Sequence, residues 1–188
     1  VHYSMGGLWT DFGPDQNGLI DHGSPRNQMT SIKGLFAAGE ADYQYHGANR
    51  LGANSLLSCI YTGLMMARGI MNYTDSLEKS VDDIPSTVFD DARNHWDNRF
   101  KEIKKMDGPE NPYQLHQELG EIMLANVLIV RDNKSLEKAT DEIKDIETRF
   151  KDIKCMDSSD WANPSPSFIN QLFCMIHLSK IITKGALL

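Results

Sequence analysis

Residues 39–57, GEADYQYHGANRLGANSLL, place a carboxylate, an imidazole, an arginine and three glycines within one short stretch. The apolar run that follows predicts a helix starting near Asn54 or Ser55. The amino end of a helix presents free N–H groups and a partial positive charge, which suit an anionic ring or a phosphate. The guanidinium of Arg50 offers a bidentate fork for a carboxylate. This stretch is therefore the candidate binding site.

A structural interpretation of the same residues stays open. Arg50 can tie the loop to Glu40 as a buried ion pair, in which case neither side chain meets a ligand. From the spacing alone, the ligand-binding and the structural interpretations carry equal weight.

No metal site is expected. The cysteines are odd in number and far apart, which indicates neither a disulfide framework nor zinc and fits a reducing compartment. Residues 13–24 resemble a calcium loop in part, but Gly13 and Ser24 stand where that loop needs its first ligand and its bidentate glutamate. The DQNG stretch at residues 15–18 is instead typical of a hairpin turn.

Charge and hydropathy argue against a nucleic-acid partner and against a membrane-spanning segment. The formal net charge is −7, and the mean hydropathy is −0.42. A phosphate backbone requires clustered Lys and Arg, so nucleic acid is not an expected partner. No apolar stretch reaches the roughly 18 residues that a membrane span needs, so we expect an ordinary globular chain.

The two halves of the chain differ in composition. Eleven of the fourteen glycines lie in residues 1–72, where GLWTDF and IKGLFAAG predict short strands flanking a hairpin arm. The run from Arg50 onward predicts a buried helix. Short strands, a glycine-rich loop and a buried helix are typical of a partial Rossmann-like nucleotide-binding domain.

Residues 73–188 carry four segments of helical period. The segments begin near Ile84-Pro85, Asn111-Pro112, Asn133 and Pro164, and Asn111 and Asn133 are expected to cap the helices that follow them. Their short connections predict an antiparallel helical bundle. The predicted fold class is thus α+β but mainly α, with a first domain at 1–72 and a bundle domain at 73–188.

Three motifs in this order resemble the carboxyl-terminal part of the flavoprotein subunit of succinate dehydrogenase and fumarate reductase: HYSMGGLWTD, IKGLFAAGE and HGANRLGANSLLS. The segment from Gln117 to Phe150 resembles the helical stretch that follows the FAD domain of that family. The family's GxGxxG turn, its flavin-linking histidine, its capping-domain arginine and its closing ESRGAH stretch have no match here. The resemblance therefore implies an excised fragment, inactive in isolation.

The resemblance also implies roles for single residues. His2 and Arg50 would bind the two ends of a dicarboxylate, succinate or fumarate. Glu40 would hydrogen-bond the FAD, and Ser55 and Leu56 would meet the pyrimidine edge of the flavin. The implied reaction is hydride transfer between the dicarboxylate and flavin N5.

The implied partners are an iron–sulfur subunit and a membrane anchor that binds quinone. The complex would be peripheral, on the cytoplasmic face of the bacterial inner membrane or the matrix side of a mitochondrion. The fragment itself is expected to self-associate through apolar surface left open. L-Aspartate oxidase resembles the chain too, although Met5 stands where that enzyme usually has cysteine. A stand-alone helical interaction module is the alternative outside catalysis.

Overall fold

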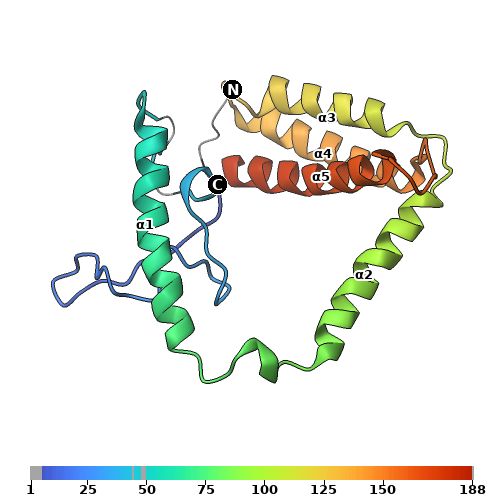
Figure 1. Cartoon of the computed structure of the whole chain (residues 1–188). Coiled ribbons are helices and arrows are strands. Elements are labelled where there is room, and N and C mark those ends of the chain that lie inside the picture. Colours follow the sequence, from blue (N-terminus) through green and yellow to red (C-terminus); the bar gives the residue numbers. More distant parts are fainter. Residues whose placement is uncertain (1–5, 44, 48–49, 188) are drawn as a thin grey trace. The chain divides into compact units, whose positions relative to one another are not determined.

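The computed structural model describes residues 6–43, 45–47 and 50–187 (Figure 1). The chain divides into two compact units, Val1–Ile84 and Pro85–Leu188. The domain boundary predicted after residue 72 falls inside a helix, α1 (Asn54–Asp75), and the division between the units comes later in the chain.

The first unit is an irregular arm packed on α1 (Asn54–Asp75). The predicted short strands are wrong in extent, because the described residues of the arm form only isolated bridges: Leu8 with Asp42, Pro14 with Ile20, and Met29 with Phe36. Left-handed backbone at Gln28 (φ 63°) and Gly34 (φ 83°) interrupts the extended conformation that a longer ladder needs. A Rossmann-like sheet is therefore not confirmed.

The predicted turn at residues 15–18 is confirmed. The carboxylate of Asp15 accepts the backbone N–H groups of Asn17 and Leu19 at 2.8 and 2.9 Å, and these bonds hold the pKa of Asp15 below its ordinary value. Gly18 adopts φ 78°, which a glycine tolerates without strain.

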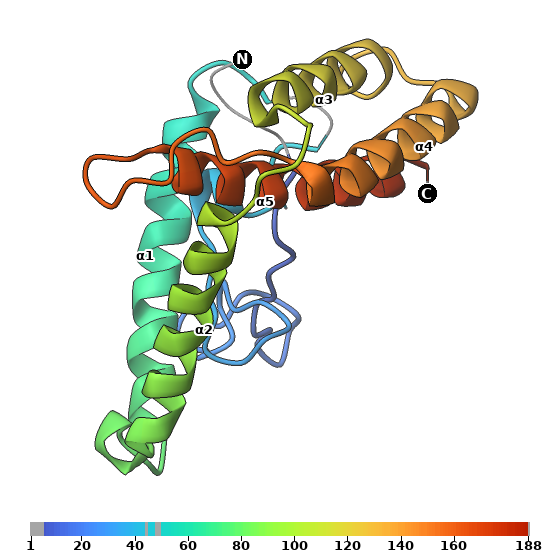
Figure 2. The same ribbon diagram turned by 90° about the vertical axis from the view of Figure 1, so that its right-hand side faces the viewer.

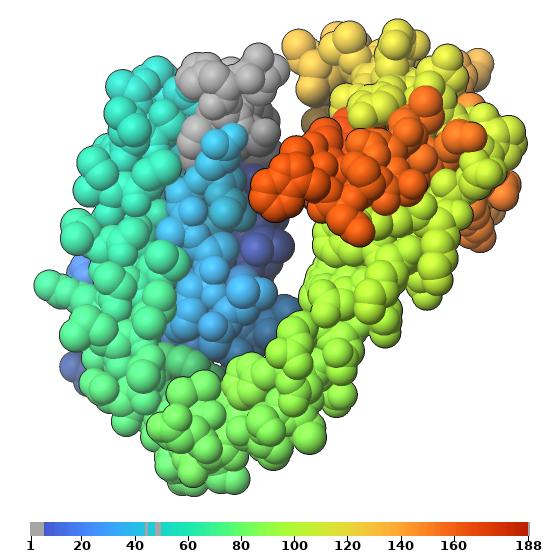
Figure 3. All heavy atoms as spheres, turned by 45° about the vertical axis from the view of Figure 1, so that its right-hand side comes forward, coloured from blue at the N-terminus to red at the C-terminus, as the bar shows by residue number. Residues whose placement is uncertain are grey.

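Helix α1 begins at the predicted residue, but it is not the buried helix that its composition predicts. Its buried positions are mostly small or polar: Ser58, Thr62, Met65 and Gly69. Its large apolar side chains, from Leu56 to Met71, are 63% to 71% exposed at five positions: Leu56, Leu57, Ile60, Leu64 and Met71. Figure 3 shows α1 along the surface of the first unit, with the arm against one of its sides.

Helix α1 exposes these large side chains because the arm packs closely against its other face. A β-carbon added to Gly69 would lie 2.7 Å from the backbone oxygen of Asn27, a separation that atoms do not adopt. The arm therefore packs on the face of α1 that has small side chains, and the leucine-rich face stays open.

The second unit has a three-helix core. Helices α3 (Pro112–Asn126), α4 (Asn133–Arg149) and α5 (Ser165–Leu187) run in alternating directions and lie side by side in both views (Figures 1 and 2). They confirm the predicted antiparallel bundle. The side chains at its centre are at most 2% exposed: Leu115, Leu119, Leu136, Ile143, Ile146, Ile169, Leu172 and Ile176.

Capping follows the sequence closely at the bundle. Asn111 accepts the N–H of Tyr113 at 2.9 Å, as predicted for the cap of α3. The cap of α4 is Asp132 rather than the predicted Asn133, and it accepts the N–H of Ser135 at 3.0 Å. Hydrogen bonds from the Ser135 hydroxyl and N–H lower the pKa of Asp132, as expected where a carboxylate meets a helix start.

Helix α2 (Ser86–Lys104) departs from the bundle prediction. Of its apolar stripe only Ile103 is buried, whereas Val88 and Trp96 are about half exposed. The helix joins the bundle near its carboxyl end, where Arg99 donates to Asn170 at 2.7 Å and stacks over the ring of Phe173 on α5.

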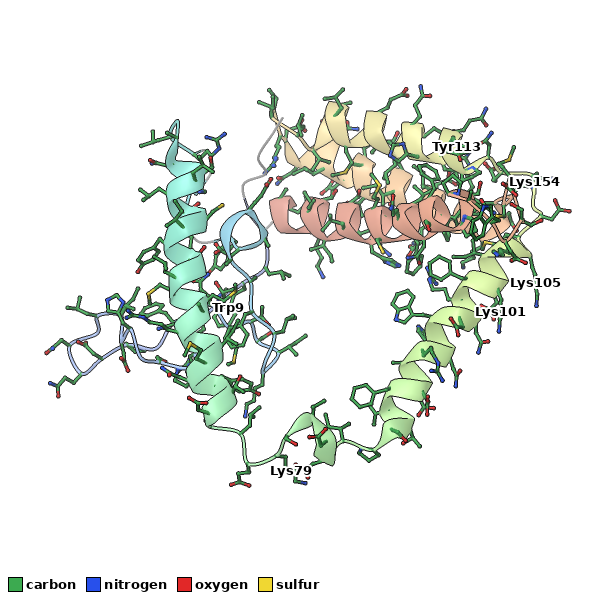
Figure 4. The ribbon with its side chains drawn as sticks, viewed as in Figure 1. Trp9, Lys79, Lys101, Lys105, Tyr113 and Lys154 are labelled. Carbon is green, nitrogen blue, oxygen red and sulfur yellow. The ribbon has the colours of Figure 1, made fainter. Side chains whose placement is uncertain are left out.

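Ion pairs close the end of the bundle at which α3 starts. Arg149 binds both carboxylate oxygens of Glu110 at 2.9 and 3.0 Å and also Glu118 at 2.6 Å. These bonds raise the pKa of Arg149 and lower that of Glu110. Lys154 pairs with Asp107 at the same end, near Tyr113 and Lys105 (Figure 4).

Replacing Ile143 by alanine tests the importance of this core. Ile143 is 0% exposed, so Ile143→Ala is expected to lower the free energy of unfolding by about 2–5 kcal/mol. Ile129, which is 85% exposed, provides the matched control, because Ile129→Ala is expected to change it by less than about 0.5 kcal/mol. Urea denaturation followed by circular dichroism at 222 nm measures both values. Equal losses in the two variants would contradict the packing described here.

Candidate functional site

The predicted site residues that the structure describes lie on one segment that leads into α1. Glu40 is exposed within a short 3-10 helix, η1 (Gly39–Ala41). Arg50 is half-buried just ahead of α1, and Ser55 and Leu56 lie in its first turn. His2 lies outside the described residues, so its place in the site stays a prediction.

Helix η1 is fastened directly to α1. The N–H of Gly39 donates to the hydroxyl of Thr62 at 2.9 Å, and Thr62 is 0% exposed. Gly39 has φ 70°, and a β-carbon there would lie 2.9 Å from the sulfur of Cys59. Only glycine suits both the backbone conformation and the space. This contact sets the position of Glu40, the next residue, beside the second turn of α1.

The loop after η1 reaches the helix a second time through His46. A ring nitrogen of His46 lies 3.0 Å from the hydroxyl of Ser58, which in turn donates to the carbonyl of Ser55 at 2.8 Å. The chain of contacts links the loop that carries Arg50 to the first turn of α1.

A buried hydrogen-bond network around the side-chain amide of Gln28 contacts the same loop. The side-chain nitrogen of Gln28 donates to the carboxylate of Asp42 and to the carbonyl of Ala37, each at 2.9 Å. Its side-chain oxygen accepts the hydroxyl of Tyr45 at 2.9 Å. Tyr45 also meets Tyr61 of α1 edge to face, with ring centroids 6.1 Å apart.

Sequence analysis missed Gln28, Tyr45, Ser58 and Thr62, and it counted the imidazole of His46 without giving it a partner. Ser58 and Thr62 left a signal, because two hydroxyl residues four apart in an apolar run mark a helix face with a polar neighbour. Gln28 left none. Its importance arises from contacts with residues distant in the sequence.

Helix α1 starts without a side-chain cap. Its N-cap is Ala53, a left-handed residue (φ 66°) whose methyl group cannot accept a hydrogen bond. A β-carbon added to Gly47 or Gly52, in the loop just before, would meet nothing within 4 Å. An open approach and a helix start without a side-chain cap suit a ligand that brings acceptor atoms to the first-turn N–H groups.

Comparison with known proteins places this site in a family. Residues 1–56 match the family model described as FAD binding domain, and residues 116–188 match the one described as fumarate reductase flavoprotein C-term. The succinate dehydrogenase flavoprotein subunit of Bacillus subtilis is 46% identical over 99% of this chain. The fumarate reductase flavoprotein subunit of Haemophilus influenzae is 30% identical over 100% of it. The chain spans 29% and 28% of the lengths of these two relatives.

Comparison with solved structures points to the same family. The quinol fumarate reductase subunit FrdA of Escherichia coli superimposes with a TM-score of 0.78 at 26% identity, covering 100% of this chain and 29% of that one. The Mycobacterium smegmatis Sdh1 structure gives a TM-score of 0.75 at 26% identity, covering 99% and 28%.

These matches define an FAD-binding flavoprotein segment followed by a helical domain. The chain belongs to the family of flavoprotein subunits of succinate dehydrogenase and fumarate reductase. The cofactor of this family is FAD, and the open, uncapped start of α1 fits the acceptor atoms of a flavin ring. Among the described residues, no helix is long and apolar enough to cross a membrane.

The titration of Tyr45 tests the buried network. Partial burial, with a smaller contribution from the Asp42 carboxylate, raises the pKa of Tyr45 to about 12, whereas an unfolded tyrosine titrates near about 10. The folded state therefore retains the proton longer, and the stability of the first unit is expected to fall as the pH rises from about 10 to about 12. Absorbance at 295 nm measured for the protein and for Tyr45→Phe gives the Tyr45 titration as a difference curve. A midpoint near 10 would show that the phenol is not held as described.

Proposed function

We propose that this chain is the flavin- and substrate-contacting section of an FAD-dependent subunit that interconverts succinate and fumarate. The observation that carries the proposal is the uncapped start of α1, with Ser55 and Leu56 in its first turn and Arg50 just before it. The 46% identity to the Bacillus subtilis succinate dehydrogenase subunit supports the choice of substrate pair.

In this proposal the residues of the chain bind and orient. When bound, FAD supplies a flavin ring that accepts a hydride from succinate or returns one to fumarate. The N–H groups of Ser55 and Leu56 would hold the pyrimidine edge of the ring, and the positive end of α1 would favour negative charge there. Glu40 hydrogen-bonds the cofactor at η1.

Arg50 and His2 hold the diacid at its two ends. Arg50 forms a bidentate pair with one carboxylate and His2 donates to the other, so the carbon that exchanges the hydride is held in one orientation. The positive charge of Arg50 also stabilises charge that develops on the carboxylate during the reaction. The structural alternative, in which Arg50 pairs only with Glu40, predicts no contact between Arg50 and the diacid.

The proposal extends to the assembled enzyme. The Escherichia coli structure that resembles the chain is a quinol fumarate reductase, the Mycobacterium smegmatis Sdh1 structure is in complex with UQ1, and a further quinol-fumarate reductase structure contains menaquinol molecules. We infer an iron–sulfur subunit and a quinone-binding anchor as partners, with the subunit peripheral to the membrane. The leucine-rich face of α1 would be covered in the whole subunit and would drive self-association of the chain alone.

Flavin binding tests the proposal against the stand-alone alternative. Residues 1–188 are joined to the parts of the Bacillus subtilis subunit that they do not span, and the chimeric subunit is purified by gel filtration. It is expected to be yellow, with close to one FAD per polypeptide by absorbance at 450 nm and 280 nm. The Bacillus subtilis parts alone serve as the control. A folded chimera that carries no flavin would contradict the proposal and favour an interaction module.

Arg50 is tested in the same chimera. Arg50→Ala removes a charge-assisted bidentate contact, so the rate at which succinate bleaches the flavin is expected to fall by about 100-fold or more, about 3 kcal/mol. Flavin content should not change. Arg68→Ala, on the exposed surface of α1, is the matched control and should bleach at the unaltered rate. Normal bleaching in Arg50→Ala would return Arg50 to a structural role.

A further inference from the structure

Gln28 is a buried polar residue of the first unit with both its backbone and its side chain engaged in hydrogen bonds. It is 3% exposed, and its backbone is left-handed (φ 63°), a conformation that is strained for a residue other than glycine. Such a conformation persists only where the surrounding contacts enforce it. Both backbone groups are engaged: its N–H donates to Asp11 at 2.9 Å, and its carbonyl accepts the N–H of Ala37 at 3.0 Å.

The side chain of Gln28 spans η1 from one end to the other. One amide nitrogen binds the carbonyl of Ala37, ahead of η1, and the carboxylate of Asp42, directly after it. Glu40 lies between these two contacts. The position of Glu40 is thus held on one side by the Gln28 amide and on the other by the bond from Gly39 to Thr62 of α1.

The contact of the amide with Asp42 stabilises a buried carboxylate. Asp42 is 6% exposed, and a buried carboxylate that loses a donor keeps the cost of its desolvation. The side-chain nitrogen of Gln28 donates to this carboxylate at 2.9 Å.

We propose that Gln28 is a positioning residue that sets the orientation of Glu40 toward the bound cofactor. Gln28 is buried beneath η1 and does not touch the ligand. The inference rests on the proposed function, which gives Glu40 its contact with FAD. It predicts that the effect of Gln28 on FAD affinity passes through Glu40, rather than through the general stability of the unit.

The test is a double-mutant cycle in the chimeric subunit. Any flavin-linking histidine of the Bacillus subtilis parts is replaced by serine, so that FAD binds reversibly and its dissociation constant is measured by quenching of flavin fluorescence. Gln28→Leu removes the amide at similar size and is expected to raise the FAD dissociation constant about tenfold or more. In a Glu40→Ala background the same change should raise it less than about twofold.

Two further variants separate positioning from folding. Gln28→Gly removes the amide but suits the left-handed backbone, so the unit folds without strain while the FAD dissociation constant still rises about tenfold. Gln16→Leu, in the exposed hairpin turn, is the matched control and should leave FAD binding unchanged.

The outcomes distinguish this inference from the proposed function. An unmutated chimera that folds but does not bind FAD overturns both. An unmutated chimera that binds FAD, with Gln28→Gly at normal affinity or with the same effect of Gln28→Leu in both backgrounds, overturns only the positioning role of Gln28.

Discussion

The arrangement of the first unit depends on how closely the arm approaches one face of α1. The N–H of Gly39 reaches the hydroxyl of Thr62 because Gly39 has no side chain and the residues of α1 that it meets, Cys59 and Thr62, have small ones. This one approach determines where η1 lies, and hence where Glu40 lies. The Gln28 amide and the pairing of Leu8 with Ala41 then fix the far side of the same short helix.

Each unit is stabilised by a different kind of interaction. The bundle of the second unit relies on apolar burial, with a continuous core from Ile103 to Ile176. Among its described residues the first unit has few large buried apolar side chains, and buried polar side chains hydrogen-bond within it: Asn27 and Thr62 accept the N–H groups of Gly13 and Gly39, and Gln28 donates to the carbonyl of Ala37. Directional bonds of this kind define one geometry closely, which suits a segment that presents chosen groups to a ligand.

Local signals in the sequence were sufficient where one residue decides the outcome. The Asn111 cap, the turn at Asp15 and the start of α1 all depend on neighbours within four residues, and all three were predicted. The cap of α4 was displaced by one residue, because Asp132 and Asn133 are both good caps and only the geometry chooses between them.

Sequence patterns predicted burial and strands incorrectly where these depend on contacts with residues distant in the sequence. The stripe of α2 and the leucines of α1 predict burial, yet residues such as Trp96 and Leu64 remain exposed, since a pattern tells which side of a helix is apolar but not what covers it. The strands failed because pairing needs a partner along its whole length. The motifs predicted roles for Glu40, Arg50, Ser55 and Leu56, whereas the contacts of Gln28 with Ala37 and Asp42 could be found only in three dimensions.

The two faces of α1 also differ in which substitutions they can accept. At Gly69 a single added carbon collides with backbone, so the limit on that face is volume, and even alanine is too large. At Leu64 the side chain meets little within this chain, so the limit there is set by whatever surface the whole subunit lays against it. Among related proteins, the residues of α1 that face the arm should therefore vary little. The residues that face outward should vary together with the surface that covers them.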